Sequence, residues 1–224
     1  MPSGAPSSGY DCRYRRTRSG RVLRVVGERY LRDDLGFGTL PGQGTLADEA
    51  QLLSVLSDEH KVEGVRQLLV LDTNVVLHQI DLLEQRCPAL CNVIVPETVL
   101  IETKANSLSV YNRLVVLLRD DSRCFVAYAN EHCRDTFVRK LPKESTNDRN
   151  DRAIRRTARW YADRLEPEGL ARVLLLTNDR ACRELAKEEG LQALRVQVSH
   201  ATSLPRRAAS LTPGGLCSLT PTAL

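Results

Sequence analysis

Short apolar runs alternate with longer helical patterns through most of this chain of 224 residues. Runs of four or five apolar residues are typical of strands buried on both faces. Their alternation with helices is typical of a parallel sheet, so we predict an α/β fold. Five parallel strands are expected at residues 67–71, 93–95, 124–128, 172–176 and 194–198. Helices are expected at residues 46–56, 74–84, 96–104, 110–119, 148–165 and 180–189.

The composition indicates a globular protein with one well-packed domain and appendages. Apolar residues make up 42% of the chain, and no apolar run approaches the roughly 20 residues of a membrane helix. We therefore expect no membrane partner. Seven cysteines without a C-x-x-C pair indicate reduced thiols in an intracellular protein, and the first eight residues lack the features of a secretory signal. Zinc at Cys87 and Cys91 is an alternative, although no second ligand pair lies nearby.

Four segments differ in composition. Residues 1–20 are rich in Ser, Gly, Pro and Arg, and are predicted to be a disordered basic arm. Residues 21–66 are predicted to be an N-terminal extension with a short strand, a glycine-rich loop and a helix. Residues 67–200 carry the alternating pattern of the α/β domain. Residues 201–224 contain no acid and are predicted to be a disordered tail.

The net charge of +4 is unevenly distributed along the chain. Residues 1–32 hold eight arginines and only two acids, whereas residues 33–59 hold six acids and no Lys or Arg. Such a basic arm either contacts RNA or an acidic protein surface, or is a solvated terminus.

Four acidic residues stand where a parallel sheet would bring them to one place. Asp72 follows the first apolar run directly, and Asp179 follows the fourth run closely. Glu102 lies on the helix after the second strand, and Asp151 lies near the start of the long helix. Ligands bind at the carboxyl ends of strands in such sheets. Because gathered carboxylates repel one another, we expect a divalent metal between them.

Each acid also has a purely structural explanation. Asp72 and Asp179 precede predicted helices, where Asp, Thr and Asn often cap free backbone N–H groups. Glu102 taken alone resembles a surface glutamate, and Glu97 is a competitor that nothing local separates from it.

Helical geometry distinguishes the two acids of segment 146–152. At about 100° per residue, Asp151 lies at the edge of an apolar face, whereas Asp148 lies close to a stripe of arginines. We therefore predict that Asp151 points into the site. The stripe is interpreted as a solvated or partner-facing surface, with RNA contact as an alternative. It consists of Arg149, Arg152, Arg156 and Arg159.

Carboxylates without histidine favour hard cations such as Mn²⁺ or Mg²⁺ over Zn²⁺. Such a cation lowers the pKa of a bound water and stabilises charge on a phosphoryl group, as in nucleases and phosphatases. A haloacid-dehalogenase-like phosphatase would carry a second Asp two residues after Asp72, where this chain has Asn74. Asn74, Asp148 and Asn178 are secondary candidates for the site.

Longer motifs surround these acids: VLDTNVVLHQID at 70–81, NDRNDRAI at 147–154, Trp160-Tyr161, LTNDR at 176–180 and YLRDD at 30–34. Over residues 21–198 the chain resembles the PIN domain of the catalytic subunit of the eukaryotic RNA exosome. That resemblance implies a Rossmann-like PIN fold and a metal-dependent endoribonuclease that acts on single-stranded RNA. Its metal ligands would be Asp72, Glu102, Asp151 and Asp179, holding Mn²⁺ or Mg²⁺.

The resemblance further implies that the N-terminal region docks onto the exosome core, in the nucleus, including the nucleolus, and in the cytoplasm. Two features depart from the family. Residues 35–60 contain no cysteine, whereas the family often carries several there. No 3′ to 5′ exonuclease region follows, so we expect a truncated form that keeps the endonuclease. A catalytically weak module that serves mainly for docking is the alternative.

Overall fold

The computed structural model describes residues 8–40, 44–58, 61–62, 64–198 and 217–221. A mixed sheet, nine-stranded over these residues, organises the body of the molecule. At its centre lie five parallel strands in the order β10-β9-β6-β7-β8. They confirm the five predicted strands. Their bounds are β6 Val65–Leu71, β7 Val93–Pro96, β8 Phe125–Tyr128, β9 Ala171–Leu176 and β10 Gln192–Val198.

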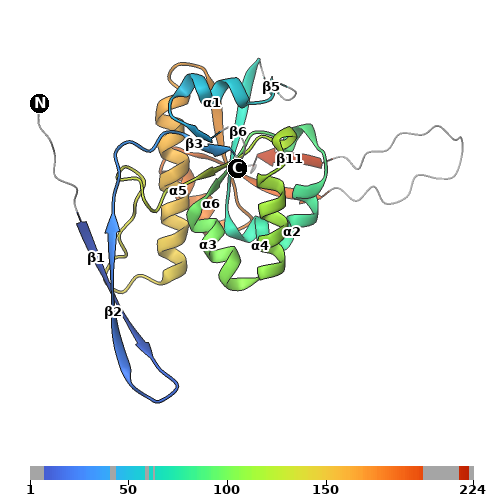
Figure 1. Cartoon of the computed structure of the whole chain (residues 1–224). Helices are drawn as coiled ribbons and strands as arrows, with labels where there is room; N and C mark the ends of the chain where they lie inside the picture. Colours follow the sequence, from blue (N-terminus) through green and yellow to red (C-terminus); the bar gives the residue numbers. More distant parts are fainter. Residues whose placement is uncertain (1–7, 41–43, 59–60, 63, 199–216, 222–224) are drawn as a thin grey trace, which may run out of the picture.

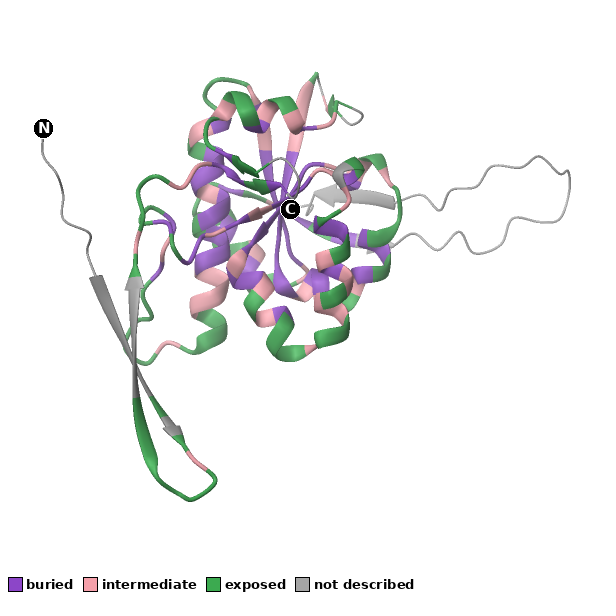
Figure 2. Ribbon diagram, viewed as in Figure 1, coloured by how far each residue is buried: buried purple, intermediate pink, exposed green. Residues whose placement is uncertain are grey.

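Helices surround the sheet, and buried residues line both the central strands and the helix faces that pack against them (Figure 2). The predicted helices are present, with ends that differ by a few residues. None of the helices in the described ranges is long and apolar enough to cross a membrane. The helices are α1 Glu49–Val55, α2 Thr73–Glu84, α3 Glu97–Asn106, α4 Leu108–Leu118, α5 Thr146–Leu165 and α6 Arg180–Glu188, with 3₁₀ turns at Pro88–Leu90 and Asp121–Arg123.

Four short antiparallel strands enlarge the predicted sheet. β3 (Gly38–Leu40) pairs with β8, β4 (Gly44–Leu46) with β3, and β5 (Lys61–Val62) with β6. β11 (Cys217–Pro221) pairs with β10. The predictions of a glycine-rich loop in the N-terminal extension and of a disordered tail were therefore wrong where β3, β4 and β11 form. Backbone pairing at a sheet edge satisfies N–H and C=O groups without a strong side-chain pattern, so sequence gives little warning of it. Tail residues 201–216 and 222–224 lie outside the described residues.

β1 (Ser8–Arg16) and β2 (Val22–Tyr30) form an antiparallel hairpin that projects from the body (Figure 1). Its turn is closed by hydrogen bonds between Thr17 and Arg21. Over residues 8–20 this hairpin corrects the prediction of a disordered arm; residues 1–7 lie outside the described residues. The two strands satisfy one another's backbone groups, which is enough for the segment to form regular structure.

From Phe37 onward, the N-terminal extension packs into the same core as the sheet. The Phe37 side chain is 6% exposed, and its ring centroid lies 5.1 Å from that of Trp160 and 5.9 Å from that of Tyr161. The Tyr161 hydroxyl donates a hydrogen bond to the Phe37 carbonyl. Leu46 and Leu52 are buried in the same cluster. These contacts anchor the extension to α5.

Candidate active site

Two of the candidate carboxylates follow the central strands β6 and β9 and stand at helix N-termini. Asp72 is the N-cap residue of α2, is only 2% exposed, and its carboxylate forms no capping hydrogen bond. Asp179 is the N-cap residue of α6, and its Oδ1 accepts from the backbone N–H groups of Ala181 (2.7 Å) and Cys182 (3.3 Å). The capping explanation thus holds for one oxygen of Asp179 but not for Asp72.

The Asn74 side chain joins the two strand ends. Its Nδ2 donates to Asp72 Oδ2 (2.7 Å) and to Thr177 Oγ1 (3.1 Å), and its Oδ1 accepts from the backbone N–H of Asn178 (3.0 Å). The Asn178 side chain in turn accepts from the backbone N–H of Val196 on β10. Both amides are therefore engaged in fixing the loops after β6 and β9. Here Asn74 orients the Asp72 carboxylate, and Asn178 ties its loop to the neighbouring strand.

Glu102, rather than Glu97, lies toward the other acids. The Thr73 hydroxyl donates to Glu102 Oε2 at 2.8 Å, which connects α2 to α3. The charge of Glu102 raises the pKa of both Asp72 and Asp151. Glu97 instead faces His132, whose Nε2 lies 3.3 Å from Glu97 Oε1. The structure therefore separates two residues that the sequence left equivalent.

Asp148 and Asp151 have different surroundings, as the helix-face argument predicted. Asp148 is exposed and completes a capping box with Ser145 at the start of α5. Burial raises the pKa of the Asp151 carboxyl to about 7, with further contributions from the charges of Asp72, Asp179 and Glu102. The other three predicted acids therefore lie close enough to Asp151 for their charges to act on it.

The pKa of the Asp72 carboxyl is also raised. Burial is the main cause that raises the pKa of its carboxyl, and the charge of Glu102 adds to it. The polar groups of the Thr177 side chain and of the Thr73 and Asn74 backbone act in the opposite direction and lower that pKa. A buried carboxyl with acidic neighbours is stabilised in its charged form by a bound cation.

A pocket of about 300 Å³ lies beside Asp151 and Asp179. Arg155, which is 5% exposed, contributes the buried cation of its lining and opposes the rise in the Asp151 pKa. Its Nε donates to Glu189 Oε1 at 2.9 Å, which links α5 to the end of α6. The other lining residues are Glu144, Asp148, Arg152, Ala181, Cys182 and Leu185.

The donor set at this edge consists of carboxylate oxygens, the ligands that Mg²⁺ and Mn²⁺ prefer. Its residues fit a hard divalent cation by the chemistry of their oxygens, and because burial and the neighbouring acidic charges, which raise the pKa of Asp151, disfavour its charged form without a cation. In the part of the chain that the structure describes, no three His, Cys, Asp or Glu side chains form a compact ligand group. The fit therefore rests on donor type and electrostatics.

Three residues of the site were missed by sequence reasoning: Thr73, Thr177 and Arg155. Thr73 is the first residue of α2, and Thr177 directly follows β9; at both positions a hydroxyl is equally expected near a helix start. Arg155 lies four residues after Asp151, so helical periodicity alone places both on one face. That spacing was the available signal for Arg155.

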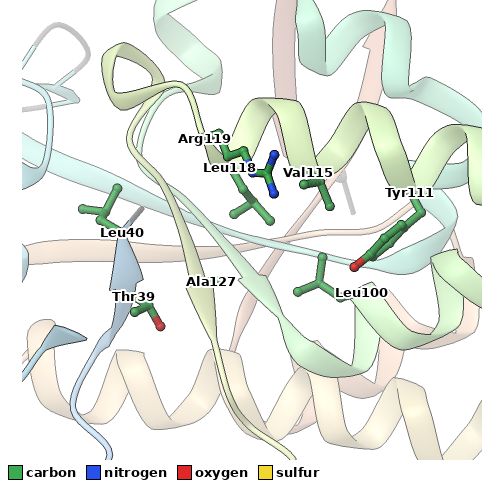
Figure 3. A pocket seen from close by; sticks show the side chains of 8 residues that line it. All are labelled: Thr39, Leu40, Leu100, Tyr111, Val115, Leu118, Arg119 and Ala127. Atoms are coloured by element: carbon green, nitrogen blue, oxygen red, sulfur yellow. The ribbon is translucent and has the colours of Figure 1, made fainter. Parts of the chain in front are cut away.

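A second pocket, of about 290 Å³, is largely apolar (Figure 3). Its lining comes from β3, β8, α3 and α4, and none of the four candidate acids belongs to it. Leu100, Val115 and Leu118 provide apolar surface, and Tyr111 and Arg119 add polar groups. This pocket is separate from the carboxylates.

Comparison with known proteins identifies the class that this fold and site define. The PIN domain family matches residues 69–197, more than half of the chain. The chain therefore belongs to the PIN domain family.

Within the PIN domain family, the chain is similar to the RRP44 exosome exonucleases. The chain is 41% identical over 186 residues to human exosome complex exonuclease RRP44, covering 80% of this chain and 19% of the relative. It is 40% identical over 183 residues to Arabidopsis thaliana exosome complex exonuclease RRP44 homolog A, covering 82% and 18%. The chain thus spans about a fifth of the length of these relatives.

A solved structure supports the fold independently. The PIN domain of T. brucei RRP44 matches with a TM-score of 0.56 and 20% identity, covering 74% of this chain and 88% of that chain. This likeness confirms the predicted α/β PIN fold.

Proposed function

We propose that the chain is a metal-dependent endoribonuclease that cleaves single-stranded RNA. The observation that carries this proposal is the proximity of Asp72, Glu102 and Asp179 to Asp151: burial raises the pKa of the Asp151 carboxyl, and the charges of these three acids add to the rise. The kinship with exosome nucleases supports a nuclease in general. The endonucleolytic mode is our inference from the clustered acids and from the resemblance of the motifs.

In this mechanism the four carboxylates would hold Mn²⁺ or Mg²⁺, and Asn74 and Thr73 orient two of these carboxylates. Such a cation, when bound, lowers the pKa of a water molecule and stabilises charge on the scissile phosphate. Asp72 supplies a buried negative charge at the strand end. Arg155 balances part of the acidic charge and holds α5 against α6.

We further propose that the chain associates with exosome core subunits, in the nucleus, including the nucleolus, and in the cytoplasm. The relatives are named as exosome complex exonucleases. The projecting hairpin offers an exposed surface for docking, because Tyr14, Val22 and Tyr30 are 72%, 62% and 57% exposed. A module that mainly docks and cleaves weakly is the second candidate, and this hairpin favours it.

The decisive experiment is incubation of a circular single-stranded RNA with the purified chain and Mn²⁺ or Mg²⁺. A circle has no end, so linear products require internal cleavage. Excess chelator should abolish cleavage, and added cation should restore it. Persistent activity in chelator would exclude the metal mechanism, and an intact circle would favour the docking module.

Asp72→Asn is the matched variant for this assay. It keeps the size of the side chain and removes one ligand charge, so we expect cleavage to fall by at least about 100-fold while the fold is retained. Thermal unfolding checks the fold. Activity within about twofold of wild type would contradict a ligand role for Asp72.

A further inference from the structure

A basic loop borders the carboxylate pocket. Arg139, Lys140 and Lys143 lie within five residues and are all exposed. No ion pair within the described ranges involves these three side chains. Together they form an uncompensated positive surface, which we name the basic loop, residues 139–143.

Hydrogen bonds hold the basic loop to α5. The Glu144 carboxylate, whose side chain is 11% exposed, accepts from Nε and Nη2 of Arg152, both at 2.9 Å, and from the backbone N–H of Leu141 at 2.7 Å. Arg152 Nη2 also donates to the Arg139 carbonyl at 2.9 Å. Lys140 Nζ donates to Thr146 Oγ1 at 3.1 Å. The loop is therefore fixed where α5 begins.

This anchoring places the basic loop beside the site. Glu144 and Arg152, which hold the loop, also line the pocket that contains Asp151 and Asp179. An acidic pocket repels the phosphates of RNA, even when a cation neutralises part of its charge. A basic rim offsets this repulsion and raises the local concentration of a polyanion.

We propose that the basic loop binds the phosphodiester backbone of a single-stranded RNA that enters the carboxylate pocket. Arg139, Lys140 and Lys143 contact phosphates next to the scissile bond, and the Glu144–Arg152 pair fixes their position. This proposal rests on the proposed function, because it names how that site takes its substrate. Charge complementarity favours RNA over an apolar partner, since three cations without counter-ions match a phosphate backbone.

Binding, rather than cleavage, tests the basic loop. A fluorescently labelled oligouridylate is titrated with the full chain in excess chelator, and its anisotropy is measured at several salt concentrations. The test variant combines Arg139→Gln, Lys140→Gln and Lys143→Gln. We expect binding to weaken at least about tenfold at low salt, and the slope of log affinity against log salt to fall by about 2, since each phosphate contact on a single strand contributes about 0.7.

A control variant removes equal charge elsewhere. Lys61→Gln, Arg86→Gln and Arg119→Gln change three exposed cations at β5, beyond α2 and at the end of α4. This control should bind RNA almost as wild type does. If both variants weakened RNA binding equally, the effect would come from net charge alone, and the proposal would be overturned. Undiminished RNA binding by the test variant would also overturn the proposal. This holds whether or not that variant binds the exosome core more weakly.

The chelator separates this proposal from the proposed function. Failure of wild type to cut a circular RNA with Mn²⁺ would reject the nuclease without altering the binding measurement. Conversely, cleavage with unchanged RNA affinity in the test variant would reject the basic loop alone. Unchanged circular dichroism of both variants checks the fold, because all six substituted side chains are exposed.

Discussion

At the scale of single residues, Asp148 and Asp151 are the sharpest comparison, because both line the pocket and they lie on one helix. We expect Asp151→Asn to abolish cleavage and Asp148→Asn to be much milder. Asp151 interacts with the other carboxylates, whereas Asp148 caps α5 and is replaced well by Asn at a helix start. Cleavage rates at saturating cation measure the difference. Equal losses would reject our assignment of Asp151.

The raised pKa of Asp151 predicts an unusual pH dependence of stability. An unfolded aspartate has a pKa of about 3.9, whereas burial and the charges of Asp72, Asp179 and Glu102 raise the folded pKa to about 7. The folded chain thus holds a proton that the unfolded chain releases, so stability falls as pH rises from about 4 to about 7.

The asparagine of the Asp151→Asn variant cannot ionise, so the stability of this variant should not fall in the same way as pH rises. Without metal it should be more stable than wild type by about 1 to 3 kcal/mol at pH 8, and nearly equal to it at about pH 4. Arg155 opposes the effect, and the site is only partly buried, so we expect less than the full shift implies. Urea unfolding in chelator at both pH values measures it. Equal stability at pH 8 would show that neither burial nor the neighbouring charges raise the pKa of Asp151 in the folded chain.

Residues of the site differed in how far sequence could predict them. The positions of Asp72 and Asp179 after β6 and β9 were predictable, because each follows a buried strand of a parallel sheet. Glu102 was separated from Glu97 only by the hydrogen bond from Thr73, which depends on how α2 packs on α3. Such a contact between distant segments leaves no periodic trace in the sequence.

At the scale of elements, α5 shows what a helical pattern omits. Its apolar face was predicted correctly, since Ile154, Ala158 and Tyr161 are buried. Its arginine stripe was expected to face solvent or a partner. Instead Arg149 forms a bidentate pair with Glu131, and Arg152 pairs with Glu144, so both hold the preceding loop. The helical periodicity of the sequence identifies the polar face of α5, but it does not show that a loop packs against that face.

β3 gives a stability prediction, because the aromatic contacts of Phe37 attach this edge strand to α5. Phe37→Ala should destabilise the chain by about 3 to 5 kcal/mol, the usual effect of removing a buried phenyl ring. Tyr14→Ala on the hairpin is the control, because Tyr14 is 72% exposed, and it should change stability by less than about 0.5 kcal/mol. Chemical denaturation measures both. A loss below about 1 kcal/mol for Phe37→Ala would mean that β3 contributes little to the core.

At the scale of the whole molecule, the five parallel strands were predictable, because four contain a short apolar run and β10 alternates apolar and polar residues. The hairpin and the edge strands were not. β1 and β2 are stabilised by backbone pairing with each other, and β3 contacts β8 across more than eighty residues of sequence. The predicted extension at 21–66 therefore contains two kinds of structure: a projecting hairpin, and a segment from Phe37 onward that belongs to the core.

Because the hairpin is separate from the core segment, docking can be tested by deleting the hairpin alone. Deleting residues 1–30 removes the hairpin but keeps Arg32, whose backbone pairs with the loop at His132 and Arg134. We expect the deleted chain to cleave free RNA normally and to bind the exosome core weakly. Wild-type binding should fall at high salt, because the hairpin is rich in exposed arginine and charges are screened beyond roughly 8 Å.

Pull-down of the core at low and high salt, together with circular-RNA cleavage, measures both properties. A deletion through residue 66 is the contrasting variant. It removes Phe37, Leu46 and Leu52 from the core, so it should unfold and lose cleavage along with binding. Undiminished core binding after the shorter deletion would move the docking surface onto the body of the PIN domain. Loss of cleavage after the shorter deletion would mean that the hairpin supports the active site through the contacts of Arg32.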